Sequence, residues 1–137
     1  MARMAKVPWK DLFAAAEAAR LKAYAPYSHF HVGAALWTGR AIVGGCNVEN
    51  ASYGLTICAE RGAVAQWRAE GHTRLLAVAI MVDSGKPTPP CGMCRQVLRE
   101  FGAPGVELRT RNKKGQEAAY TLGQLLPHAF TGKDLTK

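Results

Sequence analysis

Three cysteines in two short segments of this chain have the spacing of metal ligands. Cys91 and Cys94 form a C-x-x-C pair, which can contribute two thiolates from one turn of the backbone. Cys58 lies far from that pair in the sequence and would supply a third thiolate. Structural zinc sites have four protein ligands, whereas catalytic sites keep one position free for water. Three cysteines therefore favour a catalytic zinc site.

Glu60 follows Cys58 by two residues and is the candidate acid/base of the site. On a helix such positions point to different sides, so we expect that one metal is not chelated by both. The combination of Cys-x-Glu with Pro-Cys-x-x-Cys resembles the signature of zinc deaminases, in which the glutamate shuttles protons. A structural zinc knuckle with a chance glutamate is the alternative interpretation.

Length and composition indicate one globular domain over residues 1–137, with 48% hydrophobic and 20% charged residues. No apolar run is long enough to span a bilayer, and the first residues show no apolar region typical of a signal peptide. We therefore expect a cytoplasmic protein without membrane partners. In that compartment the four cysteines are expected to bind metal or remain free thiols.

The net charge of +8 raises the question of nucleic-acid binding. The positive residues are scattered along the chain, and only residues 109–114 form a cluster. This cluster is predicted to be a solvated hairpin or loop edge. We therefore expect no nucleic-acid partner.

The predicted elements place both cysteine segments at helix N-termini. Helices are predicted at 8–24, 57–70 (capped by Thr56) and 91–101, and strands at 32–37, 41–48, 75–82, 106–110 and 118–121, with a possible short helix at 121–126. This order predicts an α/β fold, a mixed five-stranded sheet with helices on its faces. The cysteine segments would come just after strands, where the positive helix end favours thiolates.

Four stretches carry a resemblance to a known family, at residues 27–35, 45–54, 56–61 and 90–98. With them the chain resembles the small homotetrameric cytidine deaminases, over nearly its whole length as far as residues 125–130. The resemblance implies the three-layer fold of that family, one Zn²⁺ per subunit, and a homotetramer whose pockets are completed by neighbouring subunits.

The resemblance also implies residue roles. Cys58, Cys91 and Cys94 would hold the zinc, Glu60 would shuttle protons, and Arg61 would hydrogen-bond the thiolates. Further residues would contact the nucleoside: Asn47 and Glu49 at the sugar hydroxyls, Phe30 on the base, the Ala59 N–H at the base carbonyl, and Ala51, Tyr53 and Phe130 in a neighbour's pocket.

The implied activity is hydrolytic deamination of cytidine and 2′-deoxycytidine to uridine and 2′-deoxyuridine with release of ammonia, a step of pyrimidine salvage. Two alternatives stay open: a deaminase of a modified cytosine nucleoside such as blasticidin S, and a zinc-stabilised basic domain that binds RNA. Asn47 and Glu49 favour a free ribose, and the chain lacks the stacked aromatics with basic residues of a surface that binds single-stranded nucleic acid.

Arg95 and Arg99 lie on one face of the helix predicted at 91–101. We expect them to pair with Glu100 or to face water.

Overall fold

The computed structural model describes residues 6–136, so the N-terminal residues searched for a signal peptide lie largely outside it. Its helices and strands follow the predicted order: α1 (Trp9–Arg20), β1 (Val32–Trp37), β2 (Ile42–Cys46), η1 (Tyr53–Leu55), α2 (Ala59–Ala69), β3 (Ala77–Val82), α3 (Gly92–Phe101), β4 (Glu107–Asn112), β5 (Glu117–Thr121), α4 (Leu122–Leu125) and η2 (Gly132–Asp134). No described helix has the length and apolar character needed to cross a membrane.

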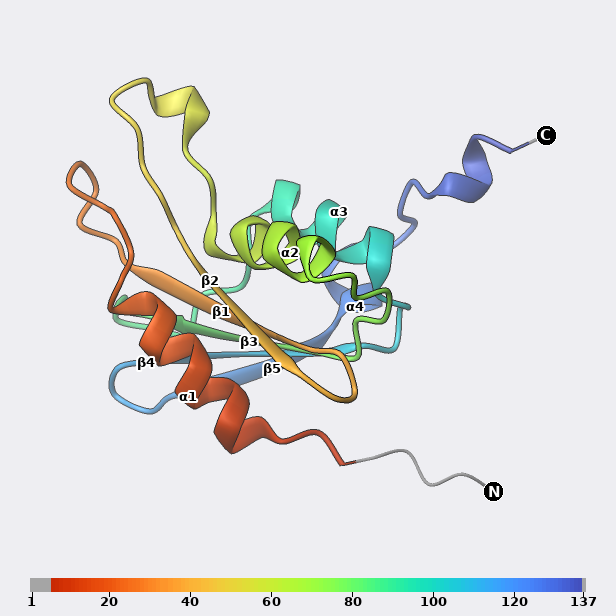
Figure 1. Ribbon diagram of the computed structural model, residues 1–137, viewed down its shortest axis with the longest axis horizontal. Coiled ribbons are helices and arrows are strands. Elements are labelled where there is room, and N and C mark those ends of the chain that lie inside the picture. The colour runs from red at the N-terminus through yellow and green to blue at the C-terminus, as the bar shows by residue number, and fades with distance from the viewer. Residues whose placement is uncertain (1–5, 137) are drawn as a thin grey trace.

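The five strands form one mixed sheet in the order β2-β1-β3-β4-β5. β3 and β4 run parallel, with α3 in the crossover between them, and the other neighbouring pairs are antiparallel. α1 covers one face of the sheet, while α2 and α3 lie side by side on the other, as Figure 1 shows. The predicted mixed sheet with helices on its faces is therefore confirmed.

The face toward α2 and α3 carries the larger core. Alternate residues of β3, among them Val78, Ile80 and Val82, are buried on this side, as the two-residue period of a strand requires. Trp67 of α2 is fully buried here and meets the ring of Phe101 at 4.9 Å, edge to face. This packing fixes α2 and α3 on the sheet, and both helices begin at the cysteine segments.

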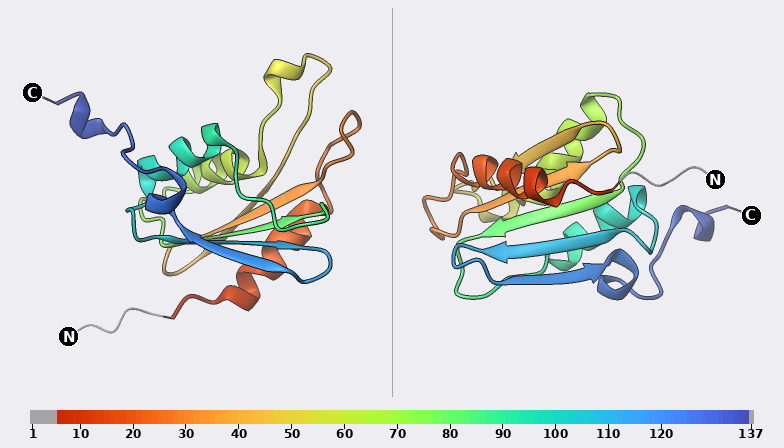
Figure 2. Two further views of the ribbon diagram at one scale, coloured as in Figure 1. Left: turned by 180° about the vertical axis from the view of Figure 1, so that it is seen from behind. Right: turned by 90° about the horizontal axis from the view of Figure 1, so that it is seen from below.

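The opposite face packs closely against α1, which lies over the β1–β3 half of the sheet (Figure 2). A Cβ at Gly33 would stand 1.8 Å from the carbonyl oxygen of Ala16, so β1 and α1 approach at a distance that only glycine permits. On β4, Arg109 stacks on Trp9 at 4.2 Å and Arg111 on Phe13 at 3.9 Å. The predicted turn between β4 and β5 exists, but these two arginines pack on α1.

Two expectations about the helix starts are corrected. Thr56 does not cap α2; the N-cap residue is Cys58, which has extended backbone angles, and its side chain makes no capping bond. Nor do the cysteine segments come just after strands, because residues 47–57 and 83–90 intervene. The short helix at 121–126 is confirmed as α4, where Thr121 and Gln124 form a capping box.

Candidate zinc and nucleoside site

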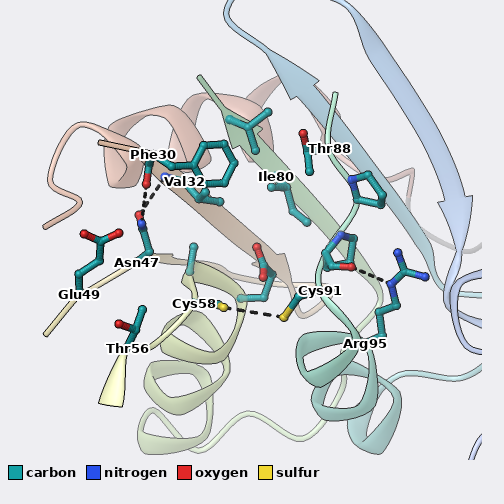
Figure 3. Close-up of a pocket in the computed structure, with 15 residues that line it drawn as sticks. Phe30, Val32, Asn47, Glu49, Thr56, Cys58, Ile80, Thr88, Cys91 and Arg95 are labelled. Carbon is teal, nitrogen blue, oxygen red and sulfur yellow. Dashed lines mark hydrogen bonds between the residues drawn. The ribbon is translucent and has the colours of Figure 1, made fainter. Parts of the chain in front are cut away.

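The three predicted cysteine ligands meet where α2 and α3 begin. Cys58 and Cys91 are the N-cap residues of these helices, and Cys94 lies in the first turn of α3. Their sulfur atoms all lie within 4.8 Å of one another, with 3.9 Å between Cys58 and Cys91 (Figure 3). Tetrahedral zinc with Zn–S bonds of about 2.3 Å holds its sulfurs about 3.8 Å apart. The donor set therefore fits one Zn²⁺ ion.

The surroundings of the cluster stabilise negative charge on sulfur. Nη2 of Arg61 donates to Sγ of Cys58 at 3.6 Å and to the Thr56 carbonyl at 3.2 Å. Hydrogen bonding from Cys94, with further contributions from Arg61 and Cys91, lowers the pKa of Cys58 to about 5. Pairing with Cys58, burial and the nearby Glu60 raise the pKa of Cys94. A bound dication would hold all three as thiolates.

Glu60 lies beside this cluster, only 4% exposed. Burial raises the pKa of Glu60, as does the negative charge of Cys58, while a hydrogen bond with Cys94 acts in the opposite direction. Cys58 and Glu60 line the same cavity, so the expectation that they point to different sides is wrong. The reason is that Cys58, as N-cap, stands outside the helix. The Glu60 carboxylate is not one of the three grouped ligand atoms.

A cavity of about 520 Å³ is lined by Cys58 and Cys91, while the buried Cys94 lies behind its wall. Its walls are mostly apolar with a few polar groups, as is usual for small-molecule sites. It collects seven of the predicted site residues: Phe30, Asn47, Glu49, Cys58, Ala59, Glu60 and Cys91. These residues come from the segment before β1, the loop after β2 and the starts of α2 and α3, which the fold brings together beside Ile80 and Val82 of the central strand β3 (Figure 3).

Asn47 connects two of these segments. Its Oδ1 accepts from the Val32 backbone N–H at 2.9 Å, and its Nδ2 donates to the Phe30 carbonyl at 2.7 Å (Figure 3). The residue is 7% exposed, so the amide is a buried brace between β1 and the loop after β2. Asn47 also lines the cavity, and these two bonds leave one of its amide hydrogens and one lone pair unused.

The predicted contributors to a neighbour's pocket do not line the cavity of their own chain. Tyr53 is 74% exposed and Phe130 is 56% exposed, and Ala51 is also on the surface. Tyr53 instead faces Tyr27, with ring centroids 5.7 Å apart. Arg61 is placed as predicted, against the cysteine cluster.

Arg95 lines the cavity, and the expectation that it pairs with Glu100 or faces water is wrong. Its Nε donates to the Pro90 carbonyl at 2.7 Å and its Nη1 donates to the Leu125 carbonyl at 3.0 Å. Arg95 therefore links Pro90, the residue before Cys91, to the end of α4. The residue types give no signal for these bonds, because the Leu125 carbonyl lies 30 residues further along the chain.

Comparison with known proteins agrees with this site. Residues 9–109 match the family described as the cytidine and deoxycytidylate deaminase zinc-binding region. The chain is 46% identical over 135 residues to a cytidine deaminase of Mycobacterium tuberculosis, covering 98% of each chain. It is 45% identical over 118 residues to a cytidine deaminase of Halalkalibacterium halodurans, covering 85% of this chain and 89% of the relative.

A solved structure agrees as well. The crystal structure of cytidine deaminase from Burkholderia pseudomallei superimposes with a TM-score of 0.86 at 46% identity, covering 90% of this chain and 100% of the other. The similarity extends well beyond the cysteine motifs, because it covers 90% of this chain.

Proposed function

This chain belongs to the zinc-binding cytidine and deoxycytidylate deaminases, and we propose that it hydrolyses cytidine and 2′-deoxycytidine to uridine and 2′-deoxyuridine with release of ammonia. It is thus a zinc-dependent hydrolase. The observation that carries the proposal is a cluster of three cysteine sulfurs, two of which belong to residues that line one cavity together with the buried Glu60. That arrangement suits activation of a water molecule beside an acid/base group.

Cys58, Cys91 and Cys94 would hold the ion, and zinc when bound would lower the pKa of water at its open position. Arg61 and the N-termini of α2 and α3 would offset the negative charge of three thiolates. Glu60 would accept one proton of the water whose oxygen adds to C4 of cytosine, and would deliver it to N3. It would then carry the second proton from the new C4 hydroxyl to the exocyclic amine, whose bond to C4 breaks as ammonia leaves.

The rest of the cavity fits a free nucleoside. The partly exposed ring of Phe30 would pack on the base, and the Ala59 N–H, at the start of α2, would donate to the base carbonyl. Asn47 has a donor left, and Glu49 is an acceptor at the cavity mouth, so the pair would satisfy a sugar hydroxyl that both donates and accepts.

We also propose a cytoplasmic homotetramer in which Ala51, Tyr53 and Phe130 complete a neighbouring pocket. Large exposed apolar side chains support an interface on the loop around η1, including Val48, Leu55 and Ile57. Light scattering coupled to gel filtration tests the assembly: four chains are expected, and a monomer would contradict it.

Ultraviolet absorbance of cytidine mixed with the zinc-loaded protein tests the activity. The cytosine band is expected to convert to that of uridine, and an unchanged spectrum with zinc present would contradict the proposal.

Glu60→Gln should retain zinc but lower kcat by at least about 10²–10⁴-fold, the range of general acid–base catalysis. Glu100→Gln, on the exposed side of α3, is the matched control and should behave as wild type. If Glu60→Gln loses its zinc, Glu60 is a ligand.

A further inference from the structure

The hydroxyl of Ser28 connects the two sides of the cavity mouth. Its Oγ donates to Oε2 of Glu49 and accepts from the Phe30 backbone N–H at 3.0 Å. The other carboxylate oxygen, Oε1, accepts from the backbone N–H groups of Tyr27 at 3.0 Å and Ser28 at 3.1 Å. One turn of backbone, residues 27–30, therefore contacts both the sugar side and the base side of the cavity.

This turn first fixes the position of the Glu49 carboxylate. Glu49 belongs to the loop after β2, and a glutamate at such a site would ordinarily sample several rotamers, which binding would have to restrict at an entropic cost. Here three donors fix the carboxylate in the absence of a ligand. A carboxylate has about four acceptor positions, so about one remains for a hydroxyl in the cavity.

The same turn also fixes the backbone of Phe30. Its N–H donates to Ser28, and its carbonyl accepts from Nδ2 of Asn47 at 2.7 Å (the latter bond is drawn in Figure 3), so both polar groups of its backbone are hydrogen-bonded. The preceding residue, His29, has a φ of 59°, in the left-handed region that a non-glycine residue seldom adopts. Such a turn persists only when surrounding bonds fix it. The Ser28 hydroxyl supplies one of them.

We infer that Ser28 is a positioning residue for the nucleoside, which sets the Glu49 carboxylate and the Phe30 ring before substrate arrives. This inference rests on the proposed function, in which Glu49 contacts the sugar and Phe30 the base. The hydroxyl acts through these two residues and does not touch the reacting atoms. Its loss should therefore raise KM and leave kcat nearly unchanged.

Electrostatics support the same assignment. The hydrogen bond from the Ser28 hydroxyl lowers the pKa of Glu49, and the backbone bonds from Ser28 and Tyr27 act in the same direction. Glu49 is thereby kept as an ionised acceptor, the form that a sugar hydroxyl can donate to.

Steady-state kinetics of Ser28→Ala and Ser28→Thr with cytidine test the inference. Ser28→Ala should raise KM about ten-fold with kcat within about two-fold of wild type, since one hydrogen bond to a charged group is lost. Ser28→Thr keeps the hydroxyl, and its extra methyl is accommodated at an exposed position, so it should restore KM. Thr38→Ala is the control: it removes a loop hydroxyl that accepts from Ala41 at 2.9 Å at the distant β1–β2 turn, and it should leave KM unchanged.

The same substitution in a Glu49→Gln background separates positioning from general damage to the loop. If Ser28 acts partly through Glu49, its penalty on KM should shrink from about ten-fold to about three-fold or less in that background. An equal penalty in both backgrounds, a wild-type KM for Ser28→Ala, or a loss confined to kcat would overturn the inference while leaving the deaminase activity standing. Calorimetric binding of uridine to wild type and Ser28→Ala gives the same comparison without turnover, so an inactive wild type would refute only the proposed function.

Discussion

Nη2 of Arg61 donates to Sγ of Cys58 across 3.6 Å, from one turn inside the helix that Cys58 caps. Three thiolates exceed the charge of a zinc ion by one, so a fixed guanidinium beside one sulfur reduces the negative charge that the metal experiences. The same bond lowers the pKa of Cys58 and raises that of Arg61. Arg61 therefore belongs to the electrostatics of the site although it does not line the cavity.

Replacing Arg61 should weaken catalysis more than zinc binding. Arg61→Gln removes the positive charge but can still hydrogen-bond, and we expect kcat to fall about 10–100-fold, the usual range for residues that support metal ligands. Arg68→Gln is the matched control, since Arg68 lies on the same helix and donates to the His72 carbonyl at 2.8 Å, away from the cluster. The measurements are kcat and bound zinc per chain for each variant. An Arg61→Gln enzyme with wild-type kcat would contradict the proposed role of Arg61.

The guanidinium of Arg95 should matter for both the cavity and the fold. Arg95→Ala removes the bonds to the carbonyls of Pro90 and Leu125, and we expect a loss of about 1–3 kcal/mol in the free energy of unfolding, because these partners are left unpaired. A lower kcat/KM should accompany it, since Pro90 directly precedes Cys91. Arg99→Ala, which loses the bond to the Gly102 carbonyl, should show a smaller effect on both quantities.

The close contact between β2 and α2 depends on Gly45. A Cβ there would stand 2.4 Å from the Ala63 backbone nitrogen and 2.7 Å from its Cα, so α2 would have to move away from the sheet. We expect Gly45→Ala to cost about 1–3 kcal/mol of unfolding free energy, the range for overpacking. Gly44→Ala is the control on the same strand, because its Cβ would meet its nearest neighbour at 3.7 Å. Equal denaturation midpoints for the two variants would refute the contact.

The ion pair between Glu17 and Arg20 predicts a pH dependence of stability. Nε of Arg20 donates to Glu17 at 2.9 Å, and this bond lowers the pKa of Glu17 from 4.5. A carboxyl whose pKa is lower in the folded state adds stability above its unfolded pKa, and this contribution is lost as pH falls through the folded pKa. Since the glutamate side chain is 36% exposed, we expect a contribution of at most about 0.5 kcal/mol.

Urea denaturation of wild type and Glu17→Gln from about pH 6 to about pH 3 measures this contribution. The stability difference between the two should be present at pH 6 and shrink below 4.5. If the stability difference between wild type and Glu17→Gln stays constant across this range, the ion pair between Glu17 and Arg20 does not contribute to the pH dependence. Glu100→Gln serves as the control, since Glu100 forms no ion pair in the part of the chain that the structure describes.

The strands and helices could be predicted because their patterns are local. The run of apolar residues in β3 indicates a strand buried on both faces, and the cysteine spacing indicates ligands from a helix start. The start of α2 was predicted wrongly because Thr56 has the residue type of a cap. Tertiary contacts instead place the helix start at Cys58, where the sulfur faces its partners from α3.

The supporting roles of Arg95 and Ser28 could not be predicted, because their partners lie far away in the sequence. Arg95 binds a carbonyl 30 residues further on, and Ser28 meets the Glu49 carboxylate 21 residues away. No residue-type pattern encodes such contacts, which arise only when the sheet brings the segments together. The ligands and Glu60, in contrast, stand in a motif whose chemistry is visible in residue types alone.

X-ray absorption at the zinc edge of the native protein tests the central claim most directly. Three sulfur neighbours at about 2.3 Å and one lighter atom are expected, in wild type, in Glu60→Gln and in the control Cys46→Ser alike. Four sulfur neighbours in wild type, or a lighter neighbour that disappears in Glu60→Gln, would contradict a three-cysteine site that keeps its fourth position free beside an acid/base carboxylate.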